Sequence, residues 1–91
     1  MLHLSLEENG EPLYVQIYQQ IKQQIRSGQL PDNERLPSKR QLAAQMGISV
    51  NTVNAAYSQL VSEGFLLAQP QRGFFVCHLD ELIQNDIAEE K

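Results

Sequence analysis

The sequence predicts a mainly α-helical domain in which three helices are followed by a small two-stranded β-hairpin. Two helical patterns in the middle of the chain are separated by Gly47, and each begins with its own serine, Ser38 or Ser49. Two short apolar, partly aromatic segments follow the helical region and flank residues 69–73. Capped helical patterns ahead of paired apolar segments are typical of a helical domain that ends in a hairpin.

The first element that we expect is an amphipathic helix behind a loose N-terminal arm, residues 1–11. Pro12 suits the first turn of a helix, where its missing N–H does no harm, and Gly28 ends the pattern. Between them apolar side chains recur every four residues: Leu13, Ile17, Ile21 and Ile25. This spacing predicts one buried face, widened by Tyr14 and Tyr18, with a glutamine-rich face opposite. We expect these tyrosines to be core residues.

The second helix is predicted from its cap. Residues 30–35 form a turn in which Asn33 tolerates a left-handed conformation. Ser38 stands three residues before Gln41, which is the spacing of a capping box. Gly47 ends this helix because glycine takes the left-handed conformation that a helix end needs.

The third helix and the hairpin complete the fold. Ser49 caps a helix over residues 50–62, whose buried side chains are expected at helical spacing: Val53, Ala56, Tyr57 and Leu60. Residues 65–68 and 74–77 form the two strands, and the loop between them is expected to be too long for a tight turn, with its tip at 70–73. Three helices followed by a hairpin make a winged helix-turn-helix, here over residues 12–78. The sequence therefore predicts DNA binding.

The composition of the chain limits the classes of protein to which it can belong. A chain of 91 residues with 42% apolar content fits one folded domain. No apolar run approaches the roughly 18 residues of a membrane span, and the N-terminus lacks a signal pattern. Cys77 is the lone cysteine, so no internal disulfide is expected, and no Cys and His cluster has metal-ligand spacing. We expect a cytoplasmic protein without membrane contact, and an enzyme is not indicated, because no nucleophile–base pair or phosphate-binding glycine loop is present.

The charge of the chain is distributed unevenly. The net charge is −4, which is unusual for a DNA-binding chain. Residues 80–91 alone sum to −4, whereas residues 35–79 sum to +3. The helix-turn-helix and wing are therefore basic. The segment 79–91 is expected to be an acidic linker or the start of a tail helix.

By its motifs the chain resembles the GntR family of bacterial transcription regulators. The resemblance spans about residues 12–77 in register and rests on these segments: Pro12-Leu13-Tyr14, Gln16-Ile17, Ile25-Arg26-Ser27-Gly28-Gln29-Leu30, Leu36-Pro37-Ser38, Arg40, Leu42-Ala43, Gly47-Ile48-Ser49, Asn51-Thr52-Val53, Ala56-Tyr57, Leu60, Glu63-Gly64-Phe65-Leu66 and Arg72-Gly73-Phe74-Phe75-Val76. It implies a regulator that works as a homodimer on double-stranded DNA.

Within the family the chain is most similar to the MocR type and next to the YtrA type. The MocR resemblance implies a long linker and an aminotransferase-like domain that binds pyridoxal phosphate, which would lie beyond Lys91. No cofactor is expected in the chain itself. The YtrA resemblance implies only a short helical dimerisation tail. Both subtypes stay open at this point, as do the operator, the effector and the direction of regulation.

The first turn of the third helix holds the candidate base-reading residues Ser49, Val50, Asn51, Thr52 and Asn54. Asparagine can pair with adenine through two hydrogen bonds, and the methyl group of threonine can contact that of thymine. Serine and threonine can also bind phosphate, or serve only as caps. Many family members have arginine at position 50, and many outside these two types also have it at 54, so readout here is expected to depend on Asn51 and Thr52.

The remaining candidate DNA-binding residues flank that helix. The resemblance implies a DNA contact by Arg40, with Lys39 and Ser38 beside it, and contacts of Arg72 and Gly73 with the minor groove. Ser38 also has a structural role as N-cap. The small number of cations also leaves open an alternative function, that of a winged-helix protein–protein interaction module with weakened DNA binding.

Overall fold

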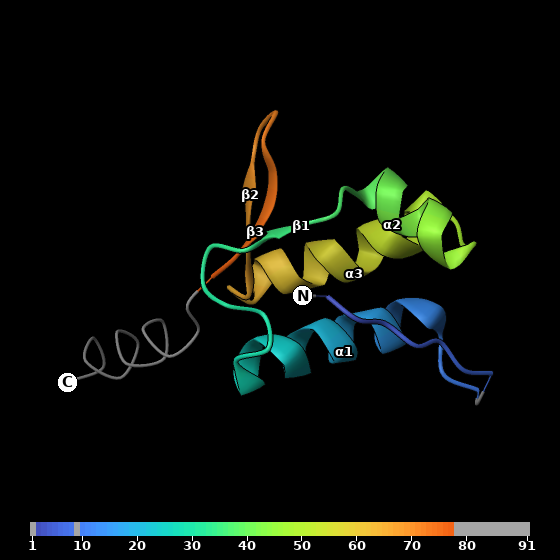
Figure 1. The fold of residues 1–91 in the computed structure, drawn as a ribbon. Helices are drawn as coiled ribbons and strands as arrows, with labels where there is room; N and C mark the ends of the chain where they lie inside the picture. The colour runs from blue at the N-terminus through green and yellow to red at the C-terminus, as the bar shows by residue number, and fades with distance from the viewer. Residues whose placement is uncertain (1, 9, 78–91) are drawn as a thin grey trace.

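The computed structural model describes residues 2–8 and 10–77. They contain three helices and three short strands. In chain order they are α1 (Leu13–Ser27), β1 (Arg35–Leu36), α2 (Lys39–Met46), α3 (Val50–Ser62), β2 (Leu66–Gln69) and β3 (Gly73–Val76). Helices α1 and α3 lie side by side, and the β2–β3 hairpin projects from the side of α3 away from α1 (Figure 1). The predicted fold class is confirmed, and the expected linker or tail helix over 79–91 lies outside the described residues.

Helix α3 is the centre of the core, because α1, α2 and β2 all pack against it. Its four predicted core residues are fully or almost fully buried: Val53, Ala56, Tyr57 and Leu60. They join buried apolar side chains from every other element in a single cluster. Burial of such a side chain contributes about 1.5–3 kcal/mol, so the position of α3 is fixed by packing along most of its length.

The predicted caps of the second and third helices are confirmed. The Ser38 hydroxyl accepts from the Gln41 backbone N–H, and the Gln41 side chain accepts from the Ser38 N–H, which completes the capping box. Gly47 ends α2 in the left-handed conformation, with φ of 69°. Ser49 caps α3 by accepting from the Thr52 N–H. These short-range bonds set the direction in which α3 leaves the turn.

The sheet has three strands rather than the two predicted. Strand β1 pairs antiparallel with β3, which also pairs with β2. The sequence interpretation placed Arg35 in a turn, but the chain from Asn33 onward runs along β3. The N–H of Asn33 donates to Val76 O, and the N–H of Val76 donates to Glu34 O. A two-residue strand is too short to show a period of two, so its pattern could not be detected.

The wing loop is tighter than expected. Gln69 pairs with Gly73, which leaves a loop of only residues 70–72. The Arg72 N–H donates to Gln69 O over 3.0 Å, closing a β-turn with Pro70 in its second position. Gln71 in the third position has φ of 65°. The prediction of a loop too long for a tight turn was wrong, because glutamine gives no sign that it will adopt a left-handed conformation.

The buried stripe of α1 is shifted from the predicted one. Leu13 and Tyr14 at its start are 37% and 42% exposed, although both were expected in the core. Tyr18 is half-buried, and its hydroxyl donates to the Glu63 carboxylate at the end of α3. On the face expected to be polar, Gln16 and Gln24 are buried.

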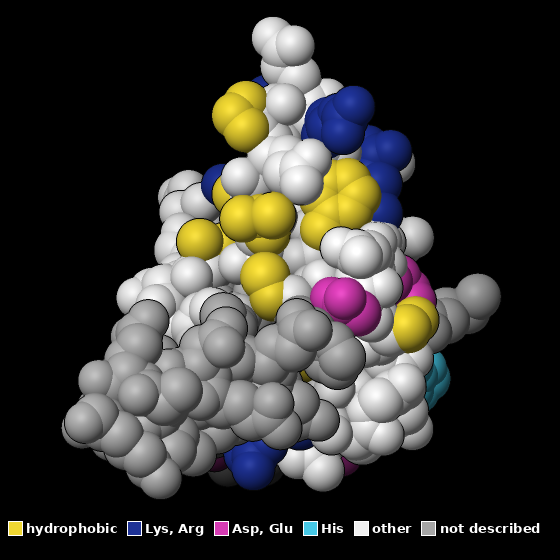
Figure 2. Space-filling model, turned by 90° about the vertical axis from the view of Figure 1, so that its left-hand side faces the viewer, with side chains coloured by type: hydrophobic (Ala, Val, Ile, Leu, Met, Phe, Trp, Pro, Cys, Tyr) yellow, Lys and Arg dark blue, Asp and Glu magenta, His cyan; other side chains and the backbone are white. Residues whose placement is uncertain are grey.

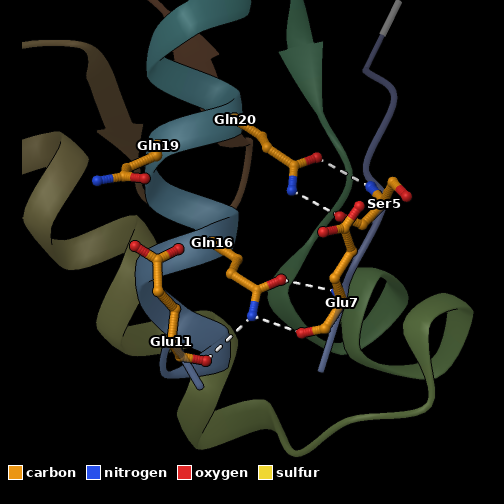
Figure 3. Close-up of a pocket in the computed structure, with 6 residues that line it drawn as sticks. All are labelled: Ser5, Glu7, Glu11, Gln16, Gln19 and Gln20. Atoms are coloured by element: carbon orange, nitrogen blue, oxygen red, sulfur yellow. Dashed lines mark hydrogen bonds between the residues drawn. The ribbon is translucent and has the colours of Figure 1, made fainter. Parts of the chain in front are cut away.

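Those glutamines hold the N-terminal arm, which is packed and not loose. Three side-chain amides of α1 each accept from the backbone N–H and donate to the backbone C=O of one arm residue. The pairs are Gln16 with Glu7, Gln20 with Ser5 and Gln24 with His3. Figure 3 shows the first two pairs, with Gln16 also donating to the Glu11 carbonyl. We call these paired amides the glutamine ladder.

The glutamine ladder works because two periodicities agree. Four residues of an α-helix advance about 6.0 Å, and two residues of an extended chain advance about 6.6 Å. Every fourth residue of α1 therefore meets every second residue of the arm. The alternate arm residues, Leu2, Leu4 and Leu6, pack against the core cluster, so the arm has one polar and one apolar side, as a strand does.

Candidate nucleic-acid interface

The start of α3 presents exposed side chains beside the buried Val53. Val50 is 43% exposed, Asn51 is exposed, and Thr52 is half-buried. The hydroxyl groups of Ser49 and Thr52 are 2.8 Å apart, within hydrogen-bonding distance. The Ser49 cap thus holds this turn in a fixed conformation while leaving the Val50 and Asn51 side chains accessible to a groove.

Lys39 joins the start of α2 to α3. Its Nζ donates to Asn54 Oδ1 over 2.6 Å and lies 5.4 Å from the centre of the Phe74 ring. The Asn54 carbonyl oxygen is therefore engaged within the protein, whereas its amide NH₂ remains a donor. Two of the predicted DNA-binding residues, Lys39 and Asn54, are thus brought together across the α2–α3 contact.

Ser38 and Arg40 lie at the start of α2, where both are exposed. The Ser38 hydroxyl is occupied by the capping box as an acceptor, and it retains its O–H as a donor. Arg40 projects from the first turn, and it forms no ion pair within residues 2–8 and 10–77. The structure thus presents Arg40 as an accessible cation beside the α3 turn.

The wing and the start of α2 enclose a hollow of about 480 Å³, which we call the wing hollow. It contains three predicted residues, Ser38, Arg72 and Gly73, and one cation that the sequence interpretation missed, Arg35. Arg35 belongs to β1, which pairs with β3 and so places it beside the wing. The sequence signal for Arg35 is its share of the positive charge of residues 35–79, which does not place it beside the wing.

A second hollow, of about 380 Å³, lies between the starts of α1 and α3. Asn51 and Thr52 line it together with Pro12, Leu13 and Tyr14. Tyr14 therefore lies near the candidate base-reading turn, and its aromatic character alone gave no means of separating this position from a core position. Of the ten predicted residues, three line the wing hollow and two line this second hollow, while Lys39 and Asn54 contact each other.

Other kinds of site receive no support from the described part of the chain. It contains no group of three or more His, Cys, Asp or Glu residues able to hold a metal ion. Burial, together with the nearby Asp32 carboxylate, raises the pKa of the Cys77 thiol, which disfavours the reactive thiolate. No helix within residues 2–8 and 10–77 is long and apolar enough to cross a membrane.

Comparison with known sequences identifies a family over most of the chain. Residues 13–76 match the family described as bacterial regulatory proteins, gntR family. The repressor NagR of Bacillus subtilis is 49% identical over 65 residues, which cover 71% of this chain and 27% of NagR. The uncharacterised regulator YdeL of the same organism is 42% identical over 69 residues, covering 76% of this chain and 15% of YdeL. The chain thus spans less than a third of the length of these relatives.

Solved structures agree with this assignment. YtrA from Sulfolobus acidocaldarius, a GntR-family transcription factor, is 36% identical with a TM-score of 0.76, covering 93% of this chain and 97% of YtrA. The DNA-binding domain of AraR, in complex with operator ORE1, is 28% identical with a TM-score of 0.69, covering 85% of this chain and 95% of that chain. The relatives are transcription regulators, and the alternative of a protein–protein module is not supported. The chain belongs to the GntR family of bacterial regulatory proteins, as a winged helix-turn-helix DNA-binding domain.

Proposed function

We propose that this domain binds double-stranded DNA sequence-specifically, with α3 in the major groove and the wing tip at residues 70–73 at the minor groove. The observation that carries the proposal is that the side chains of Val50, Asn51 and Asn54 are exposed at the start of α3, while buried side chains at helical spacing anchor the same helix in the core. A rigid helix with an exposed polar start suits major-groove recognition. Similarity to AraR domains solved with operator DNA supports binding to double-stranded DNA.

The proposed roles follow from side-chain chemistry. Asn51 pairs with an adenine edge, and Val50 or the Thr52 methyl group contacts a thymine methyl group. Asn54 contributes only its NH₂ group, because Lys39 occupies its oxygen. The cap residue Ser49 contacts phosphate near the start of α3.

The flanking residues anchor the domain on the DNA backbone and in the minor groove. Arg40 and Ser38 contact phosphates from the start of α2, and Lys39 contributes positive charge beside them. Arg72 enters the minor groove, which the backbone at Gly73 can approach closely. These contacts position the domain, whereas Asn51 and Thr52 select the sequence.

For the whole regulator we propose a cytoplasmic homodimer on two half-sites, with a MocR-type second domain. The small share of YdeL that the match covers, 15%, is what a long additional domain would produce. Pyridoxal phosphate would belong to that domain and to no residue of this sequence. The YtrA type remains the second candidate, since the resemblance covers 97% of YtrA.

Selection of bound duplexes from a random-sequence pool tests sequence-specific binding. We expect a short enriched motif, and Asn51→Ala should relax the preference at one adenine position by about 1–3 kcal/mol. Arg40→Ala should instead weaken binding about equally for all sequences. Ser58→Ala, at an exposed position later in α3, is the matched control and should leave the motif unchanged.

Salt dependence provides the second arm of this experiment. DNA binding through phosphate contacts must weaken as salt rises, and the double variant Arg40→Ala with Arg72→Ala should lose most of its affinity. The proposal fails if the wild-type domain neither enriches a motif nor binds any duplex in a salt-sensitive way. It also fails if the double variant binds as the wild type does.

A further inference from the structure

Arg35 is held against the base of the wing by the β1–β3 pairing. Its Cα pairs with that of Phe75, so the side chain starts next to the first residues of β3. A Cβ atom on Gly73 would lie only 3.3 Å from Arg35 Nε, closer than most such contacts. Gly73, with φ of 117°, leaves room for the Arg35 side chain to lie along the wing backbone. Gly73 therefore leaves space for the Arg35 guanidinium, in addition to adopting the positive φ at the end of the wing loop.

The wing hollow is lined by positive charge and by no acid. Its charged lining residues are Arg35 and Arg72, and none of the others is Asp or Glu. Lys39 adds a third cation close to the Phe74 ring, which also lines the hollow. Lys and Arg side chains gather beside the wing in the space-filling view (Figure 2). An anionic occupant is therefore favoured on charge alone.

Arg35 has no carboxylate partner within residues 2–8 and 10–77. It is also exposed, so its guanidinium is accessible to a ligand. An arginine of this kind can grip a phosphate with two parallel hydrogen bonds, which a lysine cannot do. The hollow lies between the start of α2, which is proposed above to contact DNA phosphates, and the wing, which is proposed above to reach the minor groove.

We propose that Arg35 and Arg72 together hold one phosphodiester group of the DNA backbone in the wing hollow. The proposal rests on the DNA-binding function proposed above and deepens it by assigning a backbone contact to a residue of β1. Arg72 approaches this phosphate from the wing tip and Arg35 from the wing base. Held in this way, the phosphate fixes the wing relative to α2, and with it the depth at which the backbone of the wing tip approaches the minor groove.

Salt-dependent binding to a short mixed-sequence duplex tests this assignment, because a phosphate contact is independent of sequence. Arg35→Gln removes the charge but keeps part of the side chain that packs on Gly73. We expect a several-fold loss of affinity at low salt, and a slope of log K against log salt that is smaller by about one. Arg35→Lys should restore the slope, because it restores the charge.

The matched control is Arg26→Gln, which makes the same charge change in the last turn of α1, outside the wing hollow. Its slope should equal that of the wild type. The assignment is overturned if Arg35→Gln and Arg26→Gln behave alike. It is also overturned if inorganic phosphate binds in an Arg35-dependent way while the DNA slope is unchanged.

The outcome separates this inference from the proposed function. If the wild type binds duplex DNA and Arg40→Ala weakens binding, while Arg35→Gln does not, only the Arg35 assignment fails. If the wild type shows no salt-sensitive binding, the proposed function fails first. Thermal unfolding of each variant establishes that it is folded, as expected for changes at exposed positions.

Discussion

At the scale of single residues, two turns depend on non-glycine residues with positive φ. Asn33 has φ of 71° and Gln71 has φ of 65°. Asparagine adopts this conformation at low cost because of its short polar side chain, and the prediction made for Asn33 is confirmed. Gln71 has no such advantage, so its conformation is imposed by the pairing of Gln69 with Gly73 on either side of the loop.

Gln71→Gly should therefore stabilise the domain. Glycine populates positive φ without the steric cost that a side chain incurs, about 1–2 kcal/mol. Part of this gain is offset by the greater flexibility of glycine in the unfolded chain, so we expect a net increase of about 0.5–1 kcal/mol in the free energy of unfolding. Urea denaturation measures it.

The same change in β2, Gln69→Gly, is the matched control for that substitution. It should destabilise, because Gln69 does not have a positive φ and glycine loses more conformational freedom on folding than glutamine does. If Gln71→Gly also destabilises, the turn geometry assigned to the wing is wrong.

At the scale of elements, the features that could be predicted from the sequence are those held by interactions between residues close together in the chain. The starts of α2 and α3 could be predicted because Ser38 and Ser49 bond to residues only three positions away. Strand β1 could not, since its partner Phe75 lies forty positions from Arg35. The arm was misassigned for the same reason: a glutamine on α1 reveals in sequence only that it is polar, and its partners lie up to 21 positions away.

The glutamine ladder predicts an alternating pattern of amide hydrogen exchange in the arm. The N–H groups of His3, Ser5 and Glu7 are bonded to glutamine side chains, so they should exchange more slowly than those of Leu4 and Leu6. Gln20→Ala should remove the protection of Ser5 specifically. Hydrogen exchange followed by NMR resolves these amides individually.

Gln23→Ala is the matched control for the ladder, because Gln23 is exposed on the same helix. It should leave arm exchange unchanged. Equal exchange rates at odd and even arm positions in the wild type would show that the arm is not held in this way.

At the scale of the whole molecule, Tyr57 connects the elements that make up the candidate interface. It is fully buried on α3, and its ring meets that of Phe74 on β3 edge to face, with centroids 4.8 Å apart. Its hydroxyl donates to Pro37 O over 2.8 Å, next to the Ser38 cap. Tyr57 thus contacts both the start of α2 and the wing, so one buried side chain of α3 helps to position both parts of the candidate interface.

Tyr57 should also make the stability of the domain sensitive to alkaline pH. Burial raises the pKa of its phenol above the ordinary value of 10.0, so the folded state holds the proton more tightly than the unfolded state does. The stabilising contribution is therefore complete below about pH 10 and is lost as the pH rises above it.

Tyr57→Phe removes the hydrogen bond to Pro37 O and should cost about 1 kcal/mol at neutral pH. The variant lacks the titrating group, so the gap between it and the wild type should narrow in urea unfolding as the pH increases from about 9 to about 11. Tyr14→Phe, at an exposed tyrosine, should follow the wild type at every pH, whereas a gap for Tyr57→Phe that stays constant above pH 10 would contradict the coupling of this phenol to folding.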